Sequence, residues 1–193
     1  MLFLAAALVA LDQLSKAWVV ANLPRDGTEI PLLLGFGITH TRNGGAAFGI
    51  LRDLELTVAG VTIDGTVLLG LLSAAVSVGL VYYLVRNRKR LTLLPALATA
   101  LVLAGAAGNM IDRFRLGYVI DFVHFKVGSF DFPVFNVADA CVVIGAGLLL
   151  LASLTSSGEE GDAHVKRAPL PRNHKLDDVP EPPPLGGRPT DGH

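Results

Sequence analysis

The 193-residue chain has a single cysteine, Cys141, and lacks the short motifs that identify several familiar classes of hydrolase. One cysteine excludes an internal disulfide and a cysteine-based metal cluster. No HExxH or GxSxG segment occurs, which argues against a zinc peptidase and against an α/β-hydrolase. Ser15 and Lys16 are adjacent, so they point in different directions on a helix and a Ser–Lys dyad has no support. The five histidines are scattered, and we expect no metal site.

Charge of either sign is also scarce. The formal net charge is −1, and no extended basic patch supports binding to nucleic acid. The one strongly basic cluster lies in a short link between two apolar blocks and consists of Arg86, Arg88, Lys89 and Arg90.

Long apolar blocks dominate what remains. The chain is 51% hydrophobic with a mean hydropathy of +0.53, and a membrane span needs roughly 20 mostly apolar residues. Four blocks qualify, at about residues 2–21, 66–85, 92–111 and 137–154. The first block carries polar residues in mid-run and lacks a basic segment before it, so we interpret it as a retained helix rather than a signal peptide. The pattern predicts an all-α membrane protein with four transmembrane helices.

The basic link predicts the orientation of these spans. Loops rich in Lys and Arg usually stay in the cytoplasm. With four spans, both termini are then cytoplasmic, and residues 22–65 and 112–136 lie outside.

The first outer segment has the pattern of a small β element. Alternating apolar residues at Leu32, Leu34, Phe36 and Ile38 favour strands. Such an element is either a cap over the helices or an exposed edge that holds an extended peptide. Residues 51–65 fit an amphipathic helix or a second hairpin equally well.

The composition changes after residue 155. Residues 156–193 hold seven of the eleven prolines, with mixed charges and few large apolar residues. We predict a membrane domain over residues 1–155 and a disordered cytoplasmic tail over residues 156–193.

Polar residues recur at helical spacing near the span ends. Asp12 and Lys16 are four residues apart and close enough to pair. That pair either stabilises its own helix or orients the polar ends of the others. Asn109, Asp112 and Arg113 share one face of the third span, where Asp112 and Arg113 form a structural pair or fix a catalytic neighbour.

One further aspartate lies within the second outer segment, and another lies just after it. Asp121 precedes Asp139 by 18 residues, and Asn136 and Asp139 share a face at the start of the fourth span. Asp139 alone could complement the helix dipole. Two aspartates in a poorly solvated pocket cannot both ionise cheaply, so one keeps its proton.

That asymmetry suits aspartic proteolysis, in which one carboxylate activates water and the other acid polarises the carbonyl. The same pair would also serve a proton relay in a transporter. The polar residues gather at one membrane boundary, which favours an enzyme over a path across the bilayer. A non-catalytic scaffold would leave this gathering of ionisable residues without a role.

Four segments of the sequence, in this order, resemble the signature segments of a known family: DQLSK, NGGAAFGIL, GNMIDRFRLGYVIDF and FNVADACVVIG. Together they resemble the lipoprotein signal peptidase family, the bacterial signal peptidase II family, over about residues 10–150. The resemblance implies an aspartic endopeptidase of the bacterial cytoplasmic membrane, active toward the extracytoplasmic face. It would cut prolipoprotein signal peptides just before the cysteine that carries a diacylglyceryl group.

The resemblance also implies roles for individual residues. The catalytic dyad falls on Asp121 and Asp139. The family has no metal or organic cofactor, is inhibited by globomycin-type cyclic peptides, and is expected here to act as a monomer in membrane lipid. Asn43 and Arg113 would contact the substrate backbone. The residues that would hold the dyad in register are Asn109, Asn136, Asp112, Asp12 and Lys16.

Overall fold

The computed structural model describes residues 1–45, 55–58 and 61–166. Residues 1–155 form one compact unit, and residues 156–193 form a second unit. The NGGAAFGIL segment therefore lies mostly outside the described residues, apart from Asn43, Gly44 and Gly45.

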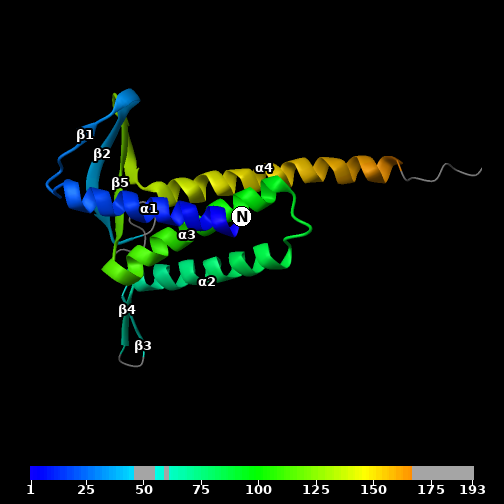
Figure 1. Cartoon of the computed structure of the whole chain (residues 1–193), viewed down its shortest axis with the longest axis horizontal. Coiled ribbons are helices and arrows are strands. Elements are labelled where there is room, and N and C mark those ends of the chain that lie inside the picture. The colour runs from blue at the N-terminus through cyan, green and yellow to red at the C-terminus, as the bar shows by residue number, and fades with distance from the viewer. Residues whose placement is uncertain (46–54, 59–60, 167–193) are drawn as a thin grey trace, which may run out of the picture. The chain divides into compact units, whose positions relative to one another are not determined.

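Four long apolar helices confirm the predicted membrane architecture (Figure 1). Each is long and apolar enough to cross a bilayer, and the chain is a multi-pass membrane protein. The helices are α1 (Leu2–Asn22), α2 (Gly65–Arg86), α3 (Leu93–Leu116) and α4 (Val137–Lys166).

Helices α1 and α2 end one residue beyond their predicted ends, and α3 and α4 run well beyond theirs. Helix α3 continues to Leu116 because the polar side chains of its last turns find buried partners. Helix α4 continues to Lys166, so residues 156–166 are helical where we predicted disorder. Within that stretch Glu159, Glu160, Ala163 and Lys166 favour helix, whereas Gly158 and Gly161 oppose it. The remaining predicted tail, residues 167–193, lies outside the described residues.

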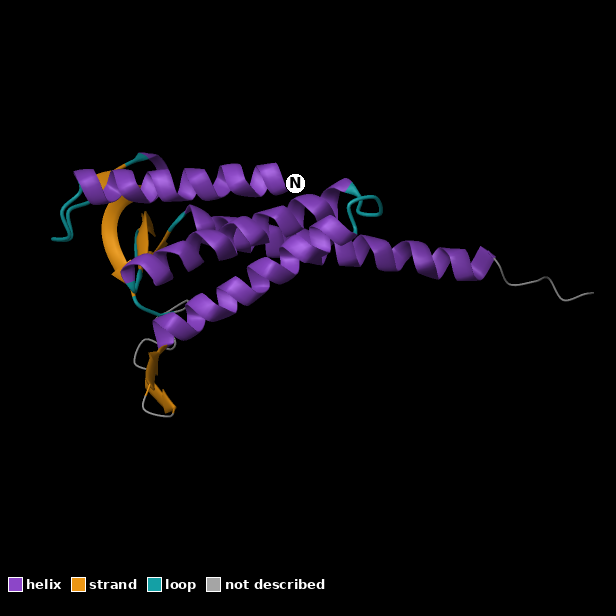
Figure 2. Cartoon of the chain, turned by 60° about the horizontal axis from the view of Figure 1, so that its bottom comes forward, coloured by secondary structure: helices purple, strands orange, loops and turns teal. Residues whose placement is uncertain are grey.

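A four-stranded antiparallel sheet lies at one end of α1 and α3 (Figures 1 and 2). Strands β1 and β2 fall in the segment where the sequence predicts a β element, but the predicted alternation is strand only from Phe36, because Leu33–Gly35 form a 3-10 turn in which Leu34 has a φ of 61°. Strands β5 and β6 lie in the second outer segment, for which we predicted no strand, although the alternation from Val123 to Val127 is a strand signal. The order is β1 (Ile30–Pro31), β2 (Phe36–Asn43), β5 (Val119–Val127) and β6 (Phe130–Phe135).

A separate hairpin decides between the two predictions for residues 51–65. Strands β3 (Glu55–Val58) and β4 (Val61–Asp64) pair antiparallel, so the second-hairpin alternative is the one that the structure adopts. Asp64 then caps α2 by accepting a hydrogen bond from the Val67 N–H at 2.8 Å.

Glycines let α3 and α4 pack closely. A Cβ at Gly105 would collide with the Ala138 carbonyl oxygen and lie 2.5 Å from Cγ2 of Val142. A Cβ at Gly145 would lie 2.8 Å from the Ala98 carbonyl oxygen. These contacts bring the start of α4 against the polar end of α3, where the predicted site residues lie.

This packing predicts opposite outcomes for two alanine substitutions. Gly105→Ala should lower the stability of the protein in detergent by about 1–3 kcal/mol, because the added methyl overpacks the helix contact. Gly147→Ala is the matched control, since nothing lies within 4 Å of its added Cβ and alanine favours helix. Thermal unfolding of both variants checks this, and equal melting temperatures would contradict the close contact.

Candidate active site

A cavity of about 570 Å³ opens at the sheet end of the molecule, between α3, α4, β5 and β6. Asp121 and Asp139 both line it, although 18 residues separate them in sequence. Phe132 to Phe135 of β6 and apolar residues of α4 form the rest of its wall. The other polar residues that line it are Asn43, Asn109 and Arg113.

Asp121 is held on β5 by two amide groups. Its Oδ1 accepts a hydrogen bond from Asn136 Nδ2 at 2.7 Å, and its Oδ2 accepts one from Asn43 Nδ2 at 3.0 Å. Strand pairing explains the second contact, because Thr41 lies opposite Asp121 and Asn43 is two residues along on the same face. The side chain is only 2% exposed.

Asp139 is held by a reciprocal cap at the start of α4. Its N–H donates to Asn136 Oδ1 at 2.8 Å, and the Asn136 N–H donates to Asp139 Oδ2 at 3.2 Å. Asn109 Nδ2 donates to the other carboxylate oxygen at 2.7 Å. The arrangement is a capping box, and it satisfies the first turn of the helix. The predicted dipole role of Asp139 is therefore compatible with a second role in the cavity.

Asn136 connects the two aspartates. It is fully buried, its side chain donates to Asp121, and its backbone N–H donates to Asp139. One residue thus orients both carboxyl groups toward a shared space.

The environment of the cavity gives Asp121 a pKa well above that of an ordinary aspartate. Burial, followed by the negative charge of Asp139, raises the pKa of Asp121 to about 7. The hydrogen bonds from Asn43 and Asn136 act in the opposite direction. Near neutral pH the Asp121 carboxyl therefore exchanges its proton readily, as a general acid or base requires.

A buried ion network supports the cavity from α1. Lys16 Nζ lies 2.8 Å from Asp12 Oδ2 and 3.0 Å from Asp112 Oδ2, and all three side chains are almost fully buried. Lys16 also donates to Asn109 Oδ1 at 3.0 Å. Because that oxygen is an acceptor, the Asn109 amide presents its NH₂ group to Asp139.

The same network anchors two backbone segments. Asp12 Oδ1 accepts the Ala138 N–H at 2.9 Å, and Asp112 Oδ2 accepts the Ile120 N–H at 3.1 Å. The Asp12–Lys16 pair therefore orients the ends of other helices and strands, which is the second of the two alternatives. The predicted pairing of Asp112 with Arg113 is wrong, because Asp112 pairs with Lys16 on α1 instead.

Arg113 keeps hydrogen-bonding capacity at the cavity. Its Nη2 donates to the Gly45 carbonyl oxygen at 3.3 Å. Its Nε is buried and has no hydrogen-bond partner within the described residues. A guanidinium offers five N–H donors, so Arg113 can still bind a carbonyl oxygen that enters the cavity.

Two features escaped the sequence analysis. Gln13 Nε2 donates to Asp112 Oδ1 at 2.9 Å, and its place beside Asp12 in an apolar helix was the available signal. His124, which we took for a lone histidine, contacts Asp131 Oδ1 at 2.7 Å and Glu29 Oε2 at 3.1 Å. These hydrogen bonds raise the pKa of His124. This cluster ties the sheet together but does not line the cavity.

No cluster of three or more His, Cys, Asp or Glu side chains in the described part of the chain is arranged to hold a metal ion. The polar side chains that line the cavity carry carboxyl, amide and guanidinium groups.

Sequence comparisons relate the chain to a family of known proteins. The family model for signal peptidase (SPase) II matches residues 4–155. A lipoprotein signal peptidase of Dehalococcoides mccartyi (strain ATCC BAA-2266 / KCTC 15142 / 195) is 42% identical over 160 residues, which cover 82% of this chain and 91% of the relative. One from Streptococcus pyogenes serotype M6 is 36% identical over 156 residues, covering 80% and 92%.

Solved structures of bacterial membrane enzymes share the fold of this chain. A bacterial membrane enzyme determined by the in meso method at 2.3 Å resolution superposes with a TM-score of 0.68 at 30% identity. The match covers 81% of this chain and 88% of that one. From the family match, the relatives and the shared fold, we conclude that this chain belongs to the signal peptidase II family of peptidases.

Proposed function

We propose that the chain is an aspartic endopeptidase that removes signal peptides from diacylglyceryl-modified prolipoproteins, cutting just before the lipidated cysteine. The observation that carries the proposal is that Asp121 and Asp139 line one cavity and are both hydrogen-bonded by Asn136. The likeness to lipoprotein signal peptidases supports the choice of substrate.

In the proposed reaction Asp139 acts as the base and Asp121 as the acid. The Asp139 carboxylate takes a proton from water as the water oxygen bonds to the scissile carbonyl carbon. Asp121 gives its proton to the carbonyl oxygen, which yields a tetrahedral diol. Asp139 then protonates the amide nitrogen, the C–N bond breaks, and a diol proton returns to Asp121 as the new carboxyl group forms.

The raised pKa of Asp121 supports this assignment, because that carboxyl is still partly protonated near neutral pH. The first turn of α4 favours a carboxylate at Asp139, because the Asn136 N–H donates to it and the positive end of the helix dipole lies there. Asn43 and Arg113 line the same cavity and are placed to bind substrate backbone, while Asn109, Asp112, Asp12 and Lys16 hold the dyad in position.

The substrate's acyl chains would reach the cavity from the bilayer. Its α4 wall includes Val143 and Ile144, which are 70% and 55% exposed and face no protein core. Strand β6 is an edge of the sheet and lines the same cavity, so an extended peptide can lie along it.

We further propose that the enzyme acts as a monomer in the bacterial cytoplasmic membrane. The basic link between α2 and α3 is at the end of the helices away from the sheet (Figure 1). A cytoplasmic link puts both termini in the cytoplasm and the cavity toward the extracytoplasmic face.

Cleavage of two matched precursors tests the proposal. We expect purified enzyme to convert a precursor with a diacylglyceryl cysteine to a fragment that begins at that cysteine, as read by mass spectrometry. The same precursor with an unmodified cysteine should be cut far more slowly, and a globomycin-type peptide should block the reaction. Equal cleavage of both precursors, or none of either, would contradict it.

A further inference from the structure

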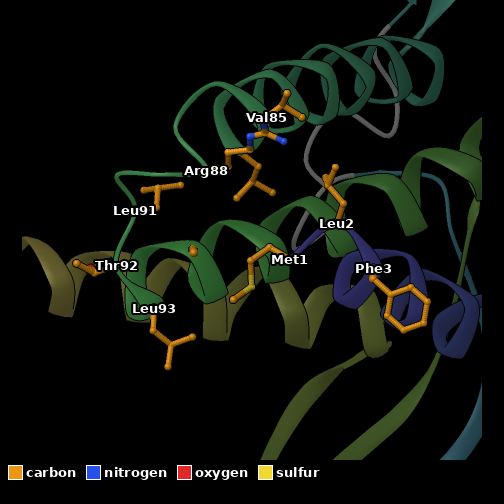
Figure 3. A pocket seen from close by; sticks show the side chains of 10 residues that line it. Met1, Leu2, Phe3, Val85, Arg88, Leu91, Thr92 and Leu93 are labelled. Atoms are coloured by element: carbon orange, nitrogen blue, oxygen red, sulfur yellow. The ribbon is translucent and has the colours of Figure 1, made fainter.

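A second cavity, of about 560 Å³, lies among the opposite helix ends (Figure 3). The first residues of α1 line one side, and the end of α2 and the start of α3 line the other (Figure 3). Most of the side chains in its walls are apolar, and several of them are exposed, including Leu2, Val85 and Leu93. Nothing in the proposed peptidase reaction uses this cavity.

The charge around this cavity has one sign. Arg88 lines it, and Arg86, Lys89 and Arg90 are its neighbours in the link. The segments that build the cavity, residues 1–11 and 75–108, contain no aspartate or glutamate. Arg88 makes no ion pair within the part of the chain that the structure describes.

The start of α3 adds to the positive potential. Thr92 lines the cavity as the N-cap of α3, and its side chain makes no capping hydrogen bond. The positive end of the helix dipole is thus directed toward the region that contains Arg88. The cavity therefore combines apolar walls with the guanidinium of Arg88 and the hydroxyl of Thr92. These groups lie at the helix ends, where a membrane helix passes from the hydrocarbon core into the headgroup region.

We propose that this cavity binds one anionic phospholipid of the bilayer leaflet at that end of the helices. The phosphate headgroup contacts Arg88 and Thr92, and an acyl chain lies against Leu84, Val85 and Leu91. Charge complementarity selects an anionic lipid over a zwitterionic one. It also disfavours a basic peptide as the occupant. The proposal does not depend on the peptidase activity.

The single tryptophan of the chain allows a direct test. Trp18 is 49% exposed near the sheet end of α1, far along that helix from the cavity. A Trp18→Phe, Val85→Trp variant moves the reporter to the wall of the cavity, three residues before Arg88 in the sequence. The unsubstituted protein and this variant are each reconstituted in phosphatidylcholine vesicles. The quenching of tryptophan fluorescence is then measured with brominated phosphatidylglycerol and, separately, with brominated phosphatidylcholine that has the same acyl chains.

We expect quenching at Val85→Trp to show about a fivefold preference for phosphatidylglycerol, the selectivity of one cationic contact. Quenching at Trp18 should show no preference. Adding Arg88→Gln should remove the preference, Arg88→Lys should keep most of it, and Lys89→Gln should leave it unchanged. The proposal is overturned by equal quenching from both lipids at Val85→Trp, by the same preference at Trp18, or by equal losses in Arg88→Gln and Lys89→Gln.

Discussion

Replacement of Asp139 or Asp121 by asparagine is expected to slow cleavage of a lipidated precursor by roughly 10³-fold or more. Asparagine matches aspartate in shape but cannot exchange a proton, so the reaction loses its base or its acid. At position 139 the amide oxygen can still accept one N–H bond, so the cap of α4 is weakened rather than lost. At position 121 the side chain faces two amide donors, Asn43 and Asn136, so one hydrogen bond is also lost.

Asp131→Asn is the matched control for both variants. Asp131 lies in the same sheet on β6, its side chain is 51% exposed, and it does not line the cavity. Its replacement should leave the initial rate nearly unchanged. Rates are measured on purified, folded protein with one lipidated precursor. Normal activity of either dyad variant would remove the basis of the proposed mechanism.

Loss of the buried cation is expected to have the largest effect on stability. Lys16→Met keeps most of the apolar stem but leaves Asp12 and Asp112 buried without their shared counter-charge. Breaking a buried ion pair in this way costs about 3–5 kcal/mol. Asn109 also loses the donor that fixes its amide orientation, so the surviving folded protein should cleave more slowly.

Lys126→Met provides the comparison. Lys126 also pairs with an aspartate, Asp131, but on the exposed part of the sheet, where such pairs contribute little. Unfolding in detergent should therefore separate the two lysine variants clearly. A Lys16→Met protein as stable as Lys126→Met would show that the buried network does not hold α1, α3 and α4 together.

The membrane helices were predictable because hydropathy acts over a local window. The observed starts of α1 and α4 match the predicted starts, and α2 begins one residue before its predicted start. The Asp12–Lys16 contact followed from helical spacing alone. Helical spacing does not predict contacts between helices, however. It therefore could not show that Asp112 on α3 pairs with Lys16 on α1 rather than with its neighbour Arg113.

The contacts around the dyad depend on chain pairing that no local pattern specifies. Asn43 reaches Asp121 only because β2 pairs with β5 in one register. Asn136 reaches both aspartates because β6 returns the chain to the start of α4 beside β5. The sequence identified these residues through a family resemblance, and the structure supplies the physical reason for their proximity.

The most direct test of the account is the titration of Asp121 in the folded enzyme. Infrared spectroscopy should detect a protonated carboxylic acid that disappears as the pH rises through about 7. The band should be absent in Asp121→Asn. It should titrate at lower pH in Asp139→Asn, because the repelling charge of Asp139 is gone while burial remains. If no carboxyl group titrates near neutral pH, or if the band persists unchanged in Asp121→Asn, Asp121 is not the acid of the pair.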